Sequence, residues 1–348
     1  MARMAREEVF SPDEIAIVHV MNRVVRRACL LGIDEFTGKN YEYRRLWIEE
    51  LIERFANYFG IDVLVFAILS NHFHSVLRSR PDIVATWDDS EVARRWLMLC
   101  PIRKTSNGEP KEPTEAELNG IRNNPQMLQE IRSRLSDISW WMRLMCQRIG
   151  IKANREDETT GKFWEARFKA VRLLDEQALL ACAAYVDLNP IRAAMAETLE
   201  ESDFTSVQRR IQSQAGCPDA DSWLAPLMID ERAAAMTGPT NPLPNSSGYR
   251  CSDLGFLPIS LNEYLQLLDW TARQAVTGKR GQTPASVRPI LERLSFDEST
   301  WCQLVQNFGQ LFYNVAGRPQ SIDDRRSRVR ARRFHLTRAA REIFSPAA

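Results

Sequence analysis

The stretch IDVLVFAILSNHFHSVLRS, residues 61–79, contains two apolar runs of strand length that are separated by a polar break near Ser70. Each run is bounded by polar residues and is short enough for one strand, so the stretch predicts a β-hairpin. In an extended second arm, the side chains of His72 and His74 point to one face and that of Phe73 points to the other. Two imidazoles on one face are suited to be half of a metal site, although core packing or chance also produces this spacing.

The length and composition of the chain set the broad class. Its 348 residues suffice for one large domain or two, and a hydrophobic content of 44% is that of an ordinary globular protein. No apolar run approaches the roughly 20 residues that span a bilayer, and the charged start contains no secretory signal. Seven dispersed cysteines show no paired metal spacing. We therefore expect reduced thiols, a cytoplasmic location and no membrane partner.

The charge of the chain is balanced overall but uneven along it. A net charge of +1 argues against nucleic-acid binding by overall charge. Arginine makes up 39 of the 46 basic residues, which suits phosphate binding and base stacking, although a GC-rich genome produces the same bias. Eight arginines lie within residues 325–341. Such a cluster indicates either a nucleic-acid contact or a solvated helix face.

The hydrophobic periodicity predicts an alternation of strands and helices before residue 200. The expected elements are a strand within 15–31, a helix over 41–59, the hairpin 61–79, a helical stretch over 81–100, a loop-rich insertion over 101–126, a helix over 127–150 that is interrupted or bent near residues 136–139, a strand within 161–174 and a helix over 175–188. This order predicts an α+β core.

Beyond residue 200 the composition changes. Residues 236–248 are rich in Pro, Gly, Ser and Asn, which is typical of a linker. The stretches 260–276, 283–294 and 299–315 have helical patterns. The C-terminal part is therefore predicted to be an all-α appendage.

The helix predicted over 175–188 carries a second candidate for chemistry. Tyr185 lies near its C-terminal end, and Asn189 follows four residues later on the same helix face. The alternative is a half-buried core tyrosine followed by an ordinary Asn-Pro helix stop.

Three motifs occur in a fixed order. They are NHFH at residues 71–74, GKFWEARFK at 161–169 and YVDLNPIRA at 185–193. In this order they resemble the single-tyrosine HUH transposases, specifically the REP-associated tyrosine transposase branch of the IS200-like transposases. Three ordered motifs at compatible spacings are far more specific than any one of them.

The resemblance covers about residues 15–211, with an insertion at about 82–135. The segments HVMNRVVRR at 19–27 and DFTSVQRRI at 203–211 also look like parts of that family. Ser70 stands where relatives often have proline, which affects the stiffness of the hairpin more than its chemistry.

The resemblance implies a fold and a domain organisation. It implies a ferredoxin-like HUH core, an antiparallel sheet with helices, over residues 1–212. A linker over 213–255 and a helical domain over 256–348 then follow, and DNA binding is one function open to that last domain.

The resemblance also implies a mechanism. His72 and His74 would hold Mg²⁺ or Mn²⁺, which polarises a phosphate oxygen. Asn189 is the candidate third ligand, because hard ions prefer oxygen donors. Asp187 is chemically the stronger ligand, but its side chain points away from the helix face that carries Tyr185. Tyr185 would attack the DNA, form a 5′-phosphotyrosine and release a 3′-OH, so that the reversal can rejoin a different end.

The expected function is therefore a metal-dependent, single-strand DNA transposase or endonuclease that cleaves and rejoins DNA at hairpins. The expected partner is a single-stranded DNA hairpin, the protein acts as a monomer or homodimer, and it associates with the nucleoid. Two alternatives stay open: a domesticated hairpin-binding regulator without catalysis, and a metal-dependent hydrolase that activates water.

Basic residues near these motifs are the candidates for DNA contact. They are Arg23, Arg26 and Arg27 at one sheet edge, and Arg167 and Lys169 on the later strand. Arg167 and Lys169 alternate with Phe168, which places phosphate contacts on one face and core packing on the other. Trp164 either stacks on an unpaired base or packs in the core.

Overall fold

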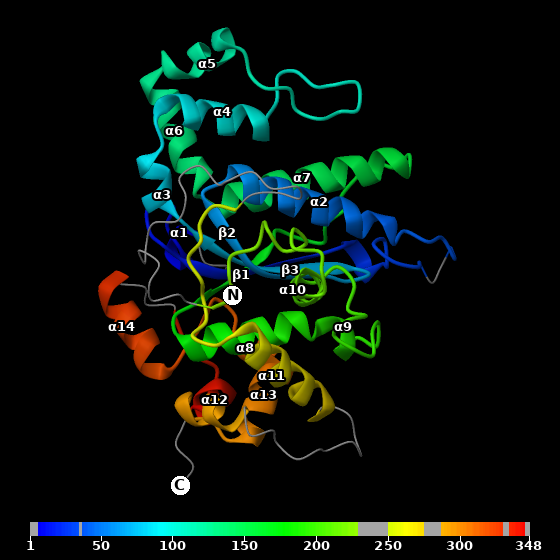
Figure 1. Ribbon diagram of the computed structural model, residues 1–348, viewed down its shortest axis with the longest axis vertical. Coiled ribbons are helices and arrows are strands. Elements are labelled where there is room, and N and C mark those ends of the chain that lie inside the picture. Colours follow the sequence, from blue (N-terminus) through cyan, green and yellow to red (C-terminus); the bar gives the residue numbers. More distant parts are fainter. Residues whose placement is uncertain (1–5, 35–36, 229–249, 275–286, 330–333, 345–348) are drawn as a thin grey trace.

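Five strands form one sheet in the part of the chain that the computed structural model describes, residues 6–34, 37–228, 250–274, 287–329 and 334–344. The strands are β1 Ile17–Arg23, β2 Ile61–Ile68, β3 His72–Ser79, β4 Lys169–Leu173 and β5 Val315–Ala316, in the sheet order β2-β3-β1-β4-β5. Strand β1 pairs antiparallel with β3 and β4, β2 pairs antiparallel with β3, and β5 pairs parallel with β4. With helices on both faces (Figure 1), this sheet confirms the predicted α+β class.

One face of the sheet is covered by α2 (Tyr43–Tyr58) and α7 (Ile138–Glu156), as Figure 1 shows. Helix α2 buries Ile48, Leu51, Ile52 and Phe55, which recur at the spacing of one helix face. Phe55 packs edge-on against Trp141 of α7, with ring centroids 5.2 Å apart. Helix α3 Pro81–Thr86 follows β3 directly, and farther from the sheet lie α4 Asp89–Leu99, α5 Glu115–Arg122 and α6 Pro125–Leu135.

The opposite face is covered by α8 (Glu176–Asp187), whose alanine-rich sequence allows close packing on the sheet. Helices α11 (Leu261–Gln274) and α13 (Glu298–Leu311) pack in the same hydrophobic core as α8. The remaining elements are α1 Arg6–Val9, the 3₁₀ helix η1 Val25–Arg27, α9 Asn189–Arg192, α10 Ser206–Gln214, α12 Val287–Arg293, α14 Pro319–Val329 and α15 Arg338–Ile343. Helices α11, α12 and α13 therefore form a further layer beyond α8, whereas α14 lies to one side (Figure 1).

Several local expectations differ from the structure. The insertion predicted as loop-rich over 101–126 contains α5, because Thr114 and Glu117 form a capping box that starts a helix. The helix expected over 127–150 is interrupted near residues 136–139 as predicted, because Asp137 caps a new helix, but that helix continues beyond Gly150 to Glu156. The strand expected within 161–174 begins only at Lys169.

The C-terminal part is not wholly helical, in contrast to the all-α expectation. Val315 and Ala316 form β5, which adds to the edge of the sheet beside Arg172 and Leu173 of β4. Two residues are too few to give an alternation pattern, so the sequence carried no signal for this strand. The predicted linker segment 236–248 and three of the arginines in the 325–341 cluster lie outside the described residues.

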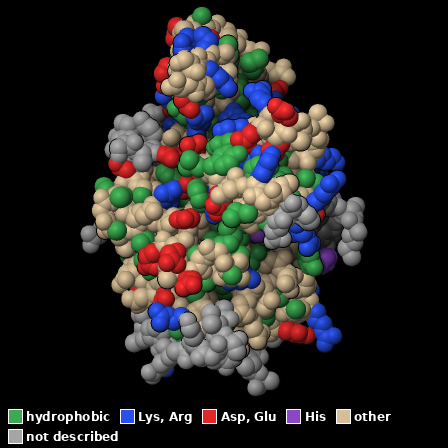
Figure 2. All heavy atoms as spheres, turned by 90° about the vertical axis from the view of Figure 1, so that its right-hand side faces the viewer, with side chains coloured by type: hydrophobic (Ala, Val, Ile, Leu, Met, Phe, Trp, Pro, Cys, Tyr) green, Lys and Arg blue, Asp and Glu red, His purple; other side chains and the backbone are tan. Residues whose placement is uncertain are grey.

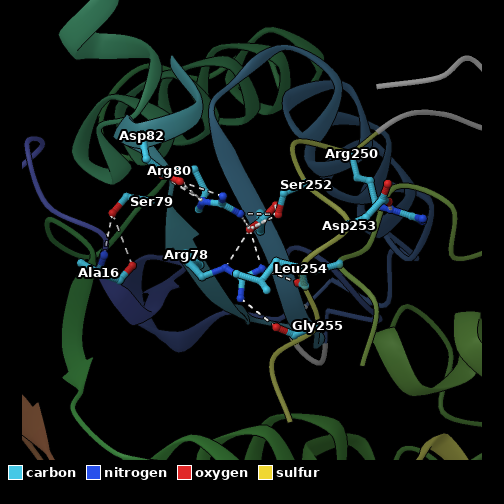
Figure 3. Close-up of polar contacts among 12 residues, drawn as sticks. Ala16, Arg78, Ser79, Arg80, Asp82, Arg250, Ser252, Asp253, Leu254 and Gly255 are labelled. Atoms are coloured by element: carbon cyan, nitrogen blue, oxygen red, sulfur yellow. Dashed lines mark hydrogen bonds and ion pairs between the residues drawn. The ribbon is translucent and has the colours of Figure 1, made fainter. Parts of the chain in front are cut away.

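A buried ion cluster ties the chain that precedes α11 to the hairpin (Figure 3). Arg78 of β3 donates from Nε to Asp62 of β2 at 2.7 Å and from Nη1 to the carbonyl of Gly255 at 3.0 Å. Ser252 donates to the same carboxylate at 2.8 Å and accepts from Arg80 Nη1 at 2.6 Å. These side chains are buried and paired, which makes each partner costly to remove. The cluster thus fixes the position of the chain before α11 relative to β2 and β3.

Candidate active site

The register of β1 and β3 places a row of polar side chains on the face that carries α8. His19 lies opposite Val76, Met21 opposite His74, and Arg23 opposite His72. Because side chains alternate along a strand, all of these residues point to the same face. The structure therefore brings His72 and His74 together with a third histidine, His19.

The imidazole contacts orient both predicted metal ligands. His72 Nδ1 lies 2.6 Å from Asn71 Oδ1, so this nitrogen carries the proton and Nε2 keeps its lone pair. His74 Nδ1 lies 2.8 Å from His19 Nε2. His74 Nε2 is buried and has no hydrogen-bond partner within the described residues. Engaged Nδ1 atoms with available Nε2 atoms are the usual arrangement of metal-binding histidines.

Tyr185 on α8 lies directly over the histidines. Asp175 caps the start of this helix by accepting from the backbone N–H of Ala178, which fixes where its turns fall on the sheet. The Tyr185 ring is perpendicular to His74, with centroids 5.5 Å apart, and lies 6.0 Å from the ring of His19. Tyr185 is half-buried, so it is neither a free surface residue nor a fully enclosed core residue.

Asn189 and Arg192 lie on α9, which directly follows α8, and both are close to Tyr185. The Arg192 guanidinium is 4.9 Å from the centroid of the Tyr185 ring. Burial raises the pKa of Tyr185 above its ordinary value, whereas Arg192 and the Asn189 side chain lower it. The Asn189 amide lies close enough to act on the hydroxyl, although its buried Nδ2 makes no hydrogen bond of ordinary geometry within the described residues. The unpartnered atom of Asn189 is thus an N–H donor, and only the amide oxygen of this side chain could bind a metal ion.

All three histidines of this site are neutral at physiological pH. Burial lowers the pKa of His19 to about 4. Burial, followed by the charge of Arg23, lowers the pKa of His72 to about 4. The pKa of His74 lies well below its ordinary value, again chiefly because of burial. A neutral imidazole is the form that binds a metal ion.

Helix α13 forms a second wall of the site. Phe308 packs against Tyr185 with ring centroids 5.7 Å apart, and the carbonyl of Gln306 accepts a hydrogen bond of 2.5 Å from Arg192 Nη2. A Cβ atom built on Gly309 would lie only 2.8 Å from the Tyr185 hydroxyl oxygen. The C-terminal part of the chain thus contributes directly to the surroundings of Tyr185.

Asp187 faces away from the histidines. Its carboxylate accepts hydrogen bonds from Ser206 Oγ at 2.6 Å, from the Val207 backbone N–H at 3.1 Å and from the Tyr264 hydroxyl at 2.8 Å. Burial raises the pKa of Asp187 to about 6, while these donors lower it. Asp187 therefore links α8 to α10 and α11.

The basic residues predicted to contact DNA lie at different distances from this site. Arg23 is on the histidine face, and the exposed Lys169 lies on the same face, opposite Met21. Arg26 and Arg27 are exposed on η1, and the carbonyl of Arg27 accepts from Asn71 Nδ2 at 3.1 Å. These residues surround the end of β3 at which the histidines lie.

Arg167 and Trp164 differ from the strand arrangement expected for them. Arg167 is exposed but precedes β4, because the chain at residues 161–168 forms an isolated bridge, between Trp164 and Val24 just after β1, and no strand. Trp164 donates from Nε1 to the carbonyl of Cys146 at 2.7 Å and packs on Phe73, with centroids 5.6 Å apart. The indole thus packs against the core. On the face of the molecule that Figure 2 draws, Lys and Arg side chains stand in separate groups and do not form one basic surface.

The metal site itself stays a prediction. Among the described residues, no three His, Cys, Asp or Glu side chains are grouped so that they could hold a metal ion. Two histidines with available Nε2 atoms nevertheless fit such an ion, provided that an amide, water or phosphate oxygen completes the set. His19 and Arg192 were not predicted as site residues. His19 and Arg23 are four residues apart along β1 and so share one face of the sheet. This spacing is the sequence signal that places His19 on the same face as Arg23, a predicted site residue.

Comparisons with known proteins add little to this description. No family model and no curated protein matches the chain. One solved structure to which it is similar is a REP-associated tyrosine transposase bound to a REP hairpin, at 12% identity, with 62% of this chain and 87% of that chain covered and a TM-score of 0.35. A likeness of that size carries no argument about activity. Within the described residues, no helix is both long and apolar enough to cross a membrane.

Proposed function

We propose that the chain cleaves and rejoins single-stranded DNA through Tyr185, with a divalent metal ion bound at His72 and His74. The observation that carries this proposal is the convergence of the tyrosine with the histidine pair, with 5.5 Å between the ring centroids of His74 and Tyr185. These residues lie far apart in the sequence and come from the two motifs that carry the family resemblance. The proposed fold is accordingly a ferredoxin-like HUH core.

The topology supports that fold. Apart from η1 and the helices α3 to α6, the chain runs β1, α2, β2, β3, α7, β4, and the sheet order of these strands is β2-β3-β1-β4 with antiparallel neighbours. Both α2 and α7 pack on the same face, which is the arrangement of a split βαβ motif. The opposite face is left for α8, which carries the tyrosine.

The proposed metal ion would be Mg²⁺ or Mn²⁺, held by His72, His74 and an oxygen ligand for which Asn189 is the candidate. When bound, the ion would polarise a non-bridging oxygen of the scissile phosphate as a Lewis acid. The protein's part is to hold the His72 imidazole through Asn71 and the His74 imidazole through His19. Burial keeps both rings neutral at neutral pH, so each ring has one protonated nitrogen and one nitrogen with a lone pair.

The proposed reaction is a phosphoryl transfer. Tyr185 loses its hydroxyl proton as a bond forms between its oxygen and phosphorus, the bond from phosphorus to the 3′ oxygen breaks, and the leaving oxygen takes up one proton to give a 3′-OH, so protons balance. Arg192, beside the tyrosine ring, supplies positive charge where the phenolate and the phosphate meet. The covalent link conserves the bond energy, so attack by another 3′-OH rejoins the DNA.

The proposed substrate is a single-stranded DNA hairpin. A net charge of +1 argues against binding by overall charge, so we expect recognition to rely on local contacts. Arg23 and Lys169 flank the histidines on the same face of the sheet and are the proposed phosphate contacts. Arg26, Arg27 and Arg167 are proposed contacts farther from the scissile phosphate.

The test is covalent capture. Hairpin oligonucleotides from the flanks of the protein's own gene are labelled at the 3′ end in one set and at the 5′ end in another, then incubated with Mn²⁺ or Mg²⁺. We expect a denaturant-resistant adduct that carries only the 3′ label, and a free fragment that carries only the 5′ label. Tyr185→Phe should abolish both, while Tyr313→Phe, which removes an exposed hydroxyl at the end of α13, should retain both.

Three outcomes contradict the proposal. Cleavage that persists in Tyr185→Phe makes an activated water the nucleophile and favours the hydrolase. Hairpin binding without any adduct in the wild type favours the regulator. An adduct that peptide mass spectrometry maps to a different tyrosine shows that the motif alignment is wrong.

A further inference from the structure

His19 contacts the predicted metal ligand His74 directly. His19 lies in the middle of β1, is only 6% exposed, and places Nε2 at 2.8 Å from His74 Nδ1. The two rings are within 12° of parallel, and their centroids are 5.1 Å apart. The distance between the ring centroids exceeds the distance between the two nitrogens by about two ring radii. The rings therefore lie edge to edge in nearly one plane, which is the geometry of an in-plane hydrogen bond.

This hydrogen bond decides which nitrogen of His74 carries the proton. A neutral imidazole has one N–H and one lone pair, so one ring of the pair donates and the other accepts. If His74 donates from Nδ1, its Nε2 keeps a lone pair. If His19 donates instead, His74 Nε2 must carry the proton and can bind no metal ion.

We propose that His19 is a positioning residue that accepts the Nδ1 proton of His74 and thereby directs the Nε2 lone pair of His74 toward a divalent metal ion. The inference rests on the proposed function, because it assigns that lone pair to the metal ion of that site. Two observations support it. His74 Nε2 is buried without a partner among the described residues, as a vacant ligand atom would be. His72 has the same arrangement, with its Nδ1 engaged by Asn71.

The first experiment reads the tautomer without any metal ion. The chain contains four histidines, so ¹⁵N-histidine labelling and long-range ¹H–¹⁵N correlation give few signals. We expect His74 of the wild type to be protonated at Nδ1. We expect His19→Leu, which removes the acceptor but keeps an apolar side chain of similar size, to shift His74 toward the Nε2-protonated form. Protonation of wild-type His74 at Nε2 would overturn the inference.

The second experiment measures Mn²⁺ affinity by the loss of the free-ion electron paramagnetic resonance signal. His19→Leu should weaken binding by about 10- to 100-fold, the usual effect of removing the partner of a metal-binding histidine. His19→Gln should restore most of the affinity, because its amide oxygen can accept the same proton. Val76→Ala is the matched control: Val76 is buried opposite His19 on β3, and its loss removes apolar volume without touching a nitrogen.

The outcomes separate this inference from the proposed function. If the wild type binds Mn²⁺ and forms the covalent adduct, and His19→Leu does both equally well, His19 is only a packing residue and this inference alone fails. If Val76→Ala weakens binding as much as His19→Leu, the effect is one of packing and the inference also fails. If the wild type neither binds Mn²⁺ nor forms an adduct, both proposals fail. Should His19→Leu not fold, the tautomer of the wild type and the affinity of His19→Gln decide the question.

Discussion

Substitution of Gly309 by alanine tests whether α13 touches the tyrosine hydroxyl in solution. The new Cβ atom would lie 2.8 Å from the hydroxyl oxygen of Tyr185 and 3.4 Å from its Cζ. The ring cannot easily move aside, because it packs against Phe308 at 5.7 Å and against His74 at 5.5 Å. The substitution therefore introduces a clash with one atom, and Tyr185→Phe removes that atom.

The size of the effect follows from two opposing contributions. Replacing glycine by alanine within a helix stabilises it by up to about 1 kcal/mol. Overpacking a buried site costs typically about 1–3 kcal/mol. Gly309→Ala in the wild type should thus change the free energy of unfolding by between roughly zero and a loss of 2 kcal/mol. In the Tyr185→Phe background the clash is absent, so alanine should stabilise by up to about 1 kcal/mol.

The assay is a double-mutant cycle in urea, with circular dichroism and tryptophan fluorescence as probes of one common transition. We expect a coupling free energy of about 1–3 kcal/mol between positions 185 and 309. Gly120→Ala in α5 is the matched control, because a Cβ atom there meets nothing within 4 Å. That control should stabilise both backgrounds equally. Equal stabilisation of both backgrounds by Gly309→Ala would refute the contact between α13 and the hydroxyl.

Three further predictions concern the metal site, the DNA contacts and pH. His72→Ala should abolish adduct formation while hairpin binding in a gel-shift assay persists, since it removes a metal ligand and leaves the basic residues; undiminished cleavage in a chelator would contradict this. Arg23→Gln and Lys169→Gln should each reduce the slope of log affinity against log salt by about 0.7 on single strands, whereas Lys111→Gln in the exposed insertion should leave it unchanged. Burial and neighbouring glutamates raise the pKa of Glu53 from 4.5 to about 7, so the folded state holds this proton longer and stability falls as the pH rises from 4.5 to about 7. Glu53→Gln should remove that fall in thermal melts across this range, and an unchanged pH profile would show that Glu53 titrates normally.

The sequence by itself determined the local geometry. The apolar spacing of α2 and the two runs of the hairpin predicted these elements, because each buries one face or lies wholly in the core. The period of a strand fixed His72 and His74 on one face, and four residues of helix placed Asn189 near Tyr185. Expectations of this kind depend only on residues a few positions apart.

Local signals also account for the errors at element boundaries. The capping box at Thr114 starts a helix within a stretch that its proline and glycine content assigned to a loop, and α7 continues to Glu156, past the end expected at Gly150. The two-residue strand β5 gave no periodic signal, and its pairing with β4 depends on a partner more than 140 positions away. Such short elements form because the sheet edge offers hydrogen bonds, not because their own residues prefer the extended state.

Only the tertiary structure decided what surrounds the tyrosine. His19 meets His74 because β1 and β3 pair in one particular register, and the two residues are 55 positions apart. Arg192 is held by a carbonyl of α13, and Gly309 lies against Tyr185, because the C-terminal helices pack on α8. Hydrophobic periodicity shows that a face is buried but not which distant segment covers it. The choice of partner depends on how all the buried surfaces fit together, and that is a property of the whole fold.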